Sequence, residues 1–102
     1  MRCRESLRGQ TCPNDAKAVL KVRSFAPIAG VSEDPVCGSG NASVAAYLDH
    51  WGVRFGGTLD YVATQGRELG RDGYVSVRVN LPSHQVSIGG HVVTCITGEL
   101  RV

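Results

Sequence analysis

Sixteen residues, EDPVCGSGNASVAAYL at positions 33–48, decide how this chain is expected to fold. Their glycines predict a tight turn that runs straight into a helix from about Gly40 to Trp51. Val44, Leu48 and Trp51 recur at i, i+4 and i+7, which predicts a buried stripe along the helix. Small alanines keep the helix thin, as suits a helix that is enclosed by a sheet.

Short strands are predicted on both sides of this helix. Before it, residues 18–25 favour a strand ended by Pro27, and their apolar side chains fall on both faces, so its buried face stays open. A loop follows at 29–32. After the helix, Gly52 is a suitable stop. Strands are predicted at 59–65, 74–79 with its valines inward, 85–88 and 91–97, separated by turns at 71–73 and 80–83 and a Gly89-Gly90 hairpin, with Gly98 ending the last strand.

One helix and four or five mostly antiparallel strands predict an α+β domain. Residues 1–16 show no clear period and are expected to form an irregular arm. Residues 17–102 are therefore predicted to be the folded domain.

Composition excludes several classes of protein. A chain of 102 residues with 42% hydrophobic and 20% charged residues is expected to fold as one domain. A net charge of +2 without a run of Lys or Arg argues against a nucleic-acid partner. No apolar stretch approaches the roughly 20 residues that span a bilayer, and residues 1–10 lack the apolar core of a secretory signal. The four cysteines, Cys3, Cys12, Cys37 and Cys95, form no CxxC pair, and we expect reduced thiols in the cytoplasm.

The glycine turn has the physical properties of an anion site. Gly38 and Gly40 allow a ligand to approach the backbone, and the helix that follows directs unpaired N–H groups and partial positive charge at the turn. Ser39 and Asn41 add side-chain donors. A helix N-terminus also lowers the pKa of a thiol such as Cys37, which favours the basic thiolate.

Asp34, three residues before Cys37, is a second candidate acid or base. The loop could therefore hold a carboxylate and place a proton-transfer group beside it, which suits chemistry at the carbon next to that carboxylate.

A structural interpretation of the same turn stays open. Gly-Ser-Gly before a helix is often only a cap, with Ser39 or Asn41 as the N-cap residue, and a lone cysteine is often a small buried hydrophobe. The GxxxxGK[ST] phosphate loop is absent. The three histidines, His50, His84 and His91, are not spaced as a metal cluster, so we predict no metal.

Several ordered motifs resemble one known family. They are Arg23-Ser24-Phe25-Ala26-Pro27, then Gly30-Val31-Ser32-Glu33-Asp34-Pro35 with Gly38-Ser39, then Gln65-Gly66 with Gly70-Arg71, then Val86-Ser87-Ile88-Gly89-Gly90, and finally Gly98-Glu99-Leu100. In this order they resemble the phenazine-biosynthesis PhzF-like family over roughly residues 19–102.

The resemblance implies a diaminopimelate epimerase-like fold, in which each of two lobes is a barrel-like, mostly antiparallel sheet around a central helix. It also implies cofactor-free isomerisation or epimerisation of a small amino-acid-like carboxylate in the cleft between the lobes. Asp34 and Ser39 match the family's site residues in the second lobe. Gly38 and Gly40 match its carboxylate-binding loop, and Gln65 is a candidate wall residue.

Two departures from the family leave alternatives open. Cys37 stands where many members carry Thr, so it is either an acid/base thiol, as in the epimerases and racemases of the wider superfamily, or a neutral replacement. The first lobe and its catalytic group are missing, and Glu5 does not replace that group. The chain is therefore expected to be a lobe that becomes active with a partner, for which a homodimer could rebuild the cleft, or an inactive module for binding or dimerisation.

Overall fold

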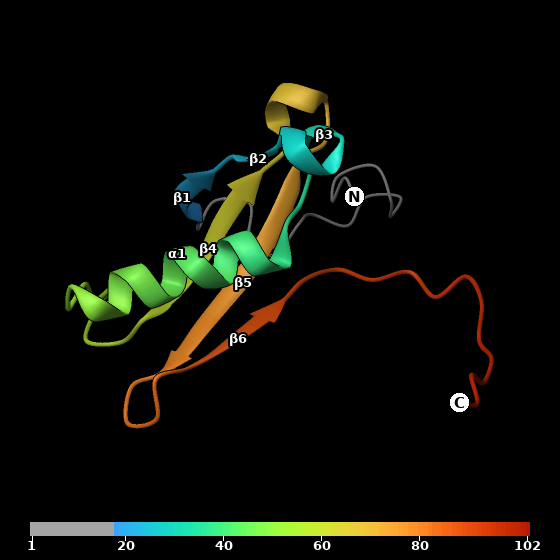
Figure 1. The fold of residues 1–102 in the computed structure, drawn as a ribbon. Helices are drawn as coiled ribbons and strands as arrows, with labels where there is room; N and C mark the ends of the chain where they lie inside the picture. Colours follow the sequence, from blue (N-terminus) through green and yellow to red (C-terminus); the bar gives the residue numbers. More distant parts are fainter. Residues whose placement is uncertain (1–17) are drawn as a thin grey trace, which may run out of the picture.

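The computed structural model describes residues 18–102, and Figure 1 shows their fold. The predicted arm at 1–16, with Cys3, Cys12 and Glu5, lies outside the described residues. The elements in chain order are β1 (Ala18–Val22), β2 (Ser24–Ala26), the 3-10 turn η2 (Pro27–Ala29), β3 (Val31–Asp34), α1 (Gly38–His50), β4 (Asp60–Gln65), the 3-10 turn η3 (Arg67–Leu69), β5 (Gly73–Asn80) and β6 (Gln85–Gly89).

Two sheets make up the β-structure. The larger has the order β1-β4-β5-β6, with β1 parallel to β4 and the other neighbours antiparallel. The smaller pairs β2 with β3 in antiparallel fashion. The prediction of an α+β domain with mostly antiparallel strands is therefore confirmed. The larger sheet does not close into a barrel, and α1 lies across one face of it (Figure 1).

The core lies between α1 and this face of the sheet. The alternation predicted for β5 is confirmed, because Val75, Val77 and Val79 are all buried while the residues between them are exposed. In β4, Tyr61 and Ala63 are buried in the same way. The remaining core residues are Val22, Ala45 and Leu59, and Leu20, Val44, Leu48, Phe55, Leu81 and Val86 pack against them.

The buried stripe of α1 differs from the predicted one by one turn. Val44 and Leu48 do pack against the core, but Trp51 is 66% exposed. The fully buried positions are Asn41 and Ala45, which lie three residues before Val44 and Leu48 respectively, about one turn away along the same face. The helix ends at His50, Trp51 is its C-cap, and Gly52 follows with a positive φ of 71°, as the stop signal predicted.

The predictions for three segments need correction. The strand at 18–25 is interrupted at Arg23, because β1 pairs with β4 whereas β2 pairs with β3. The predicted loop at 29–32 overlaps β3, which begins at Val31. The strand at 91–97 and the Gly89-Gly90 hairpin do not form: the chain after β6 has no regular structure, and Cys95, which lies in the range of that predicted strand, is exposed.

Within residues 18–102, no helix combines the length and the apolar character that crossing a membrane requires.

Candidate functional site

The connection between β3 and α1 carries the predicted site residues. Asp34 is the last residue of β3, and its Oδ1 accepts the N–H of Val36 at 3.0 Å, which turns the chain towards the helix. Cys37 is the N-cap: its backbone is extended, and its Sγ accepts the N–H of Gly40 at 3.2 Å. The expected caps, Ser39 and Asn41, are therefore wrong, because the thiol occupies the capping position and α1 begins at Gly38.

The buried amide side chains of Gln65 and Asn41 fix this connection by hydrogen bonds to its backbone. Gln65, at the end of β4, donates from Nε2 to the carbonyl of Asp34 at 2.9 Å and accepts the N–H of Cys37 on Oε1 at 3.1 Å. Asn41 donates from Nδ2 to the carbonyl of Cys37 and to Oε1 of Gln65, both at 2.8 Å. Gln65 is 1% exposed and Asn41 is fully buried. Both therefore fix the backbone on either side of the thiol.

Close packing of glycines keeps the connection against the sheet. Gly66 follows Gln65 with φ of 87°, and a Cβ there would collide with the carbonyl of Pro35. At Gly73 of β5, a Cβ would lie 2.5 Å from Cγ2 of Val36 and 2.7 Å from the Gln65 carbonyl. Because only glycine permits these approaches, the connection lies directly on the β4–β5 end of the sheet.

The environment of Cys37 lowers the pKa of its thiol. The largest cause is a hydrogen bond with Ser39, whose Oγ lies 3.3 Å from Sγ, followed by the Gly40 N–H and the hydroxyl of Ser24. Burial and the negative charge of Asp34 oppose them. Donors around the sulfur stabilise the thiolate, so the side chain is poised to accept a proton.

Ser24 is a contributor that the sequence reasoning did not assign to the site. Its Oγ lies 3.0 Å from the position that a Cβ on Gly40 would occupy, so β2 reaches the start of α1. The signal that could have found it was the matched motif at residues 23–27, in which Ser24 stands between Arg23 and Phe25. Ser24 lies 13 positions before Cys37, and no local pattern in the sequence indicates a contact over that separation.

The start of α1 also offers two backbone donors. Within residues 18–102, the N–H groups of Gly38 and Ser39 make no hydrogen bond, whereas Gly40 binds Cys37 Sγ and the Asn41 N–H binds the Cys37 carbonyl. Unpaired N–H groups at the positive end of a helix favour an anion. These two donors and the thiol lie on consecutive residues.

A cavity of about 350 Å³ adjoins this turn. It is mostly apolar, and it lies between the β3–α1 connection and the ends of β5 and β6. Its lining residues are Val36, Gly38, Gly73, Tyr74, Val75, Ile88, Gly89, Gly90 and His91. A second cavity of about 500 Å³ lies over β4, β5 and β6, away from the turn, and includes Val62, Ser76 and Arg78.

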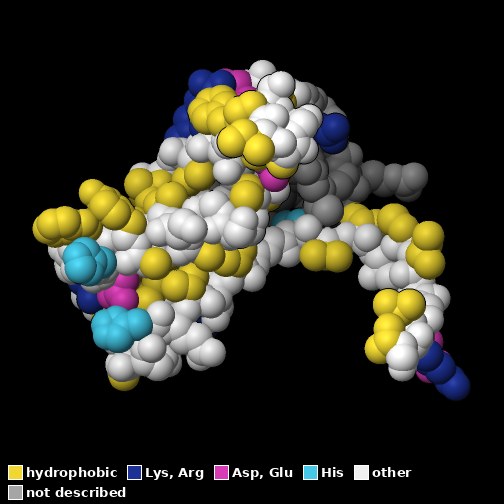
Figure 2. All heavy atoms as spheres, viewed as in Figure 1, with side chains coloured by type: hydrophobic (Ala, Val, Ile, Leu, Met, Phe, Trp, Pro, Cys, Tyr) yellow, Lys and Arg dark blue, Asp and Glu magenta, His cyan; other side chains and the backbone are white. Residues whose placement is uncertain are grey.

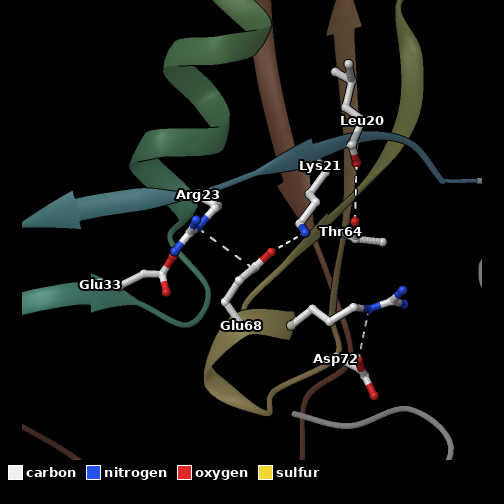
Figure 3. Close-up of polar contacts among 8 residues, drawn as sticks. Leu20, Lys21, Arg23, Glu33, Thr64, Glu68 and Asp72 are labelled. Atoms are coloured by element: carbon white, nitrogen blue, oxygen red, sulfur yellow. Dashed lines mark hydrogen bonds and ion pairs between the residues drawn. The ribbon is translucent and has the colours of Figure 1, made fainter.

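An ion-pair cluster links the segments next to the connection, as Figure 3 shows for Lys21, Arg23, Glu33 and Glu68. Arg23, between β1 and β2, binds Oε1 of Glu33 in β3 at 2.5 Å, and its Nε is 3.9 Å from Glu68 of η3. Lys21 pairs with Glu68 and is the main cause that lowers the pKa of that carboxyl. Exposed pairs of this kind contribute little energy each, but together they join β1, β3 and η3.

The structure thus brings all seven predicted site residues together. Asp34, Cys37, Gly38, Ser39 and Gly40 lie along one connection, with Asn41 and Gln65 beneath it. The histidines lie apart: His50 is at the end of α1, His91 lines the 350 Å³ cavity, and His84 binds Oδ2 of Asp49 through Nδ1 at 2.6 Å. Among the described residues, no three His, Cys, Asp or Glu side chains gather as metal ligands would.

Comparison with known proteins agrees with the motifs. The sequence model of a family described as phenazine biosynthesis-like protein matches residues 1–98. Antisense-enhancing sequence 1 of Schizosaccharomyces pombe is 38% identical over 81% of this chain and 29% of its own length. The uncharacterized isomerase YddE of Salmonella typhimurium is 39% identical over 78% of this chain and 29% of its own length. An uncharacterized isomerase of Clostridium acetobutylicum is 33% identical over 84% of this chain and 30% of its own length. The chain spans less than a third of the length of these relatives.

Proposed function

Because the chain belongs to the phenazine biosynthesis-like protein family, we propose that it is one lobe of a cofactor-independent isomerase with a diaminopimelate epimerase-like fold. The reaction is a proton transfer at the carbon next to the carboxylate of a small, amino-acid-like substrate. Cys37 is the proton-transfer group, Asp34 and Ser39 lie beside it, and the start of α1 binds the carboxylate.

The observation that carries this proposal is the capped thiol. The pKa of Cys37 is lowered by the Ser39 hydroxyl and the Gly40 N–H, so the thiolate is accessible as a base nearer neutral pH. A Thr at this N-cap would accept the same Gly40 N–H, so the capping bond by itself does not favour either role. The hydroxyls of Ser39 and Ser24, which also donate to the sulfur, are what favour the acid/base role.

In the proposed reaction, the N–H groups of Gly38 and Ser39 hold the substrate carboxylate. The Cys37 thiolate takes the α-proton, so the C–H bond breaks, an S–H bond forms, and the electron pair moves into the carboxylate as an enediolate. Donors at the helix N-terminus stabilise that added negative charge. A proton returned to carbon completes the isomerisation, and return from the opposite face inverts the centre.

Return from the opposite face requires a second acid on the other side of the substrate. The relatives are more than three times as long as the part that this chain matches, so a second lobe has ample chain to supply that acid. Exchange of the α-proton with solvent needs only the first group. It is therefore the activity expected of this chain by itself.

Deuterium exchange tests the proposal. The chain is incubated in heavy water with each common α-amino acid, and mass spectrometry measures deuterium at the α-carbon. We expect exchange into at least one of them, lowered at least about 100-fold in Cys37→Ala, because a positioned acid/base group contributes that much. Cys95→Ala, which changes an exposed thiol outside the site, is the matched control and retains the exchange rate.

Two outcomes contradict the proposal: no exchange with any amino acid, or equal exchange in the wild type and Cys37→Ala. The first outcome, with a low thiol pKa still measured at Cys37, would favour the inactive module for binding or dimerisation.

A further inference from the structure

Gly40, the third residue of α1, leaves an open position between two polar atoms of the site. A Cβ on Gly40 would lie 3.0 Å from Oγ of Ser24 and 3.2 Å from Sγ of Cys37. The hydroxyl and the sulfur therefore approach the same point, one from β2 and the other from the start of the helix. Gly40 is helical, and alanine is more favourable than glycine in a helix, so what glycine provides here is the missing side chain.

The β2–β3 pair places the Ser24 hydroxyl at this point. Ser24 in β2 pairs with Asp34 in β3, and residues directly opposite each other in an antiparallel pair have their side chains on the same face. Asp34 is also the residue from which the connection to α1 leaves. Pairing of the two strands therefore sets the hydroxyl and the carboxylate on one face, next to Cys37.

Ser24 and Asp34 act on the sulfur in opposite directions. The Ser24 hydroxyl lowers the pKa of the Cys37 thiol, whereas the negative charge of Asp34, the charged group whose field reaches the sulfur, raises it. From the helix, Ser39 and the Gly40 N–H add donors that carry no charge. A donor favours the thiolate and a nearby carboxylate disfavours it, so the two strands have separate and opposed effects on one group.

Charged side chains next to Ser24 hold the β2–β3 pair in place. A pairing of two strands this short is marginal by itself. Arg23, directly before Ser24, binds Glu33, directly before Asp34, and its guanidinium lies 5.0 Å from the centre of the Phe25 ring. Figure 2 shows basic and acidic side chains side by side at the top of the molecule, the end at which β2 and β3 lie in Figure 1. The ion pair therefore fastens the two strands at the position of Ser24.

We propose that Ser24 is a positioning residue for Cys37: its hydroxyl reaches the sulfur across Gly40 and holds the thiolate ready for proton transfer. This inference rests on the proposed function, because it gives Ser24 a task in that reaction. All of the groups involved belong to β2, β3 and α1 of this chain, so the contact needs no partner. It also explains the glycine at position 40, since a methyl group there would separate the hydroxyl from the sulfur.

The pH dependence of Cys37 alkylation by iodoacetamide tests the proposal in the full chain. Digestion and mass spectrometry separate Cys37 from the other cysteines. Ser24→Ala should raise the midpoint of the pH profile and lower the alkylation rate at pH 7 about three- to tenfold, because a hydrogen bond to a charged group is worth about one unit of pKa. Ser24→Thr keeps the hydroxyl and should keep the midpoint. Ser32→Ala, which removes a hydroxyl from an exposed residue of β3, is the matched control.

Two more variants separate this role from a general loosening of the turn. Asp34→Asn removes the charge, keeps an oxygen that can accept the Val36 N–H, and should lower the midpoint. Gly40→Ala places a methyl group between the hydroxyl and the sulfur and should raise the midpoint. In the Ser24→Ala background the same change should add little, because the hydroxyl is already absent. General loosening would instead return the thiol to its ordinary pKa in every variant.

Deuterium exchange at the α-carbon distinguishes failure of this inference from failure of the proposed function. In an active chain, the pH profile of exchange in Ser24→Ala should shift to higher pH together with that of alkylation. An alkylation midpoint unchanged in both Ser24→Ala and Gly40→Ala would overturn the role of Ser24, also in a chain that exchanges the α-proton. A raised midpoint in a chain without exchange would support the contact of Ser24 with the sulfur and would count against the isomerase reaction.

Discussion

The buried amide of Gln65 gives the sharpest test of how the candidate site is held. Gln65→Met keeps the length and approximate volume of the side chain but removes its hydrogen bonds to Asp34, Cys37 and Asn41, at 2.9, 3.1 and 2.8 Å. Each such bond contributes about 1 kcal/mol net, so the loss is about 3 kcal/mol. Polar groups left unpaired in the interior add to this value, since Gln65 is only 1% exposed.

A loss of about 3 kcal/mol is large against the ~5–15 kcal/mol that stabilises a typical domain. It should lower the melting temperature by roughly 10–20 °C in a chain of this size. Urea unfolding followed by far-ultraviolet circular dichroism measures the free energy of unfolding directly.

Thr64→Val is the matched control for this substitution. Thr64 is the preceding residue of β4 and makes a single long hydrogen bond, from Oγ1 to the carbonyl of Leu20 at 3.5 Å. Its replacement should therefore cost less than about 1 kcal/mol. If Gln65→Met lies within about 0.5 kcal/mol of the wild type, the amide does not hold the connection and this reasoning is wrong.

Three further predictions concern the same connection. The pKa of Cys37 is lowered in the folded chain, so its thiolate stabilises the fold at pH above the ordinary thiol pKa of about 8.5, and this stabilisation is lost as the pH falls through the folded pKa. The difference in the free energy of unfolding between the wild type and Cys37→Ser should therefore decrease as the pH falls. A difference that does not change with pH would contradict this prediction. Ser39→Ala should raise the midpoint of the pH dependence of Cys37 alkylation, since the Ser39 hydroxyl is the largest cause of the shift. Gly73→Ala should destabilise the fold by about 1–3 kcal/mol, because its Cβ would meet Val36 and the Gln65 carbonyl. Gly98→Ala, whose Cβ meets nothing within 4 Å, should stay within about 0.5 kcal/mol of the wild type, and equal effects at the two glycines would refute the packing explanation.

The turn into α1 shows how far local sequence leads. Gly-Ser-Gly predicted a helix start beside Cys37, and the structure has α1 begin there. The cap itself was predicted wrongly, because Ser and Asn are the usual capping residues and a thiol is an uncommon one. The sulfur takes that position since Gln65 and Asn41 fix the backbone of Cys37 on both sides.

Residues 91–97 show the opposite limit. They have strand propensity and alternation, and the sequence predicted a strand on that basis, but they form no strand in the structure, because propensity and pattern do not by themselves supply a pairing partner. Trp51 gives a smaller example: it continues the spacing of Val44 and Leu48, but it lies after the last helical residue and is 66% exposed.

Local periodicity was enough to identify the α+β class, the inward valines of β5 and the residues of the glycine turn, because each depends on neighbours within a few positions. Two features could not be predicted from the sequence and are seen only in the tertiary structure. They are the parallel pairing of β1 with β4 and the contact of Asn41 with Gln65, 24 positions later in the chain. The approach of Ser24 to Gly40 is of the same kind. These contacts join segments whose separation along the chain carries no periodic signal, and they arise only when burial of the common core brings the segments together.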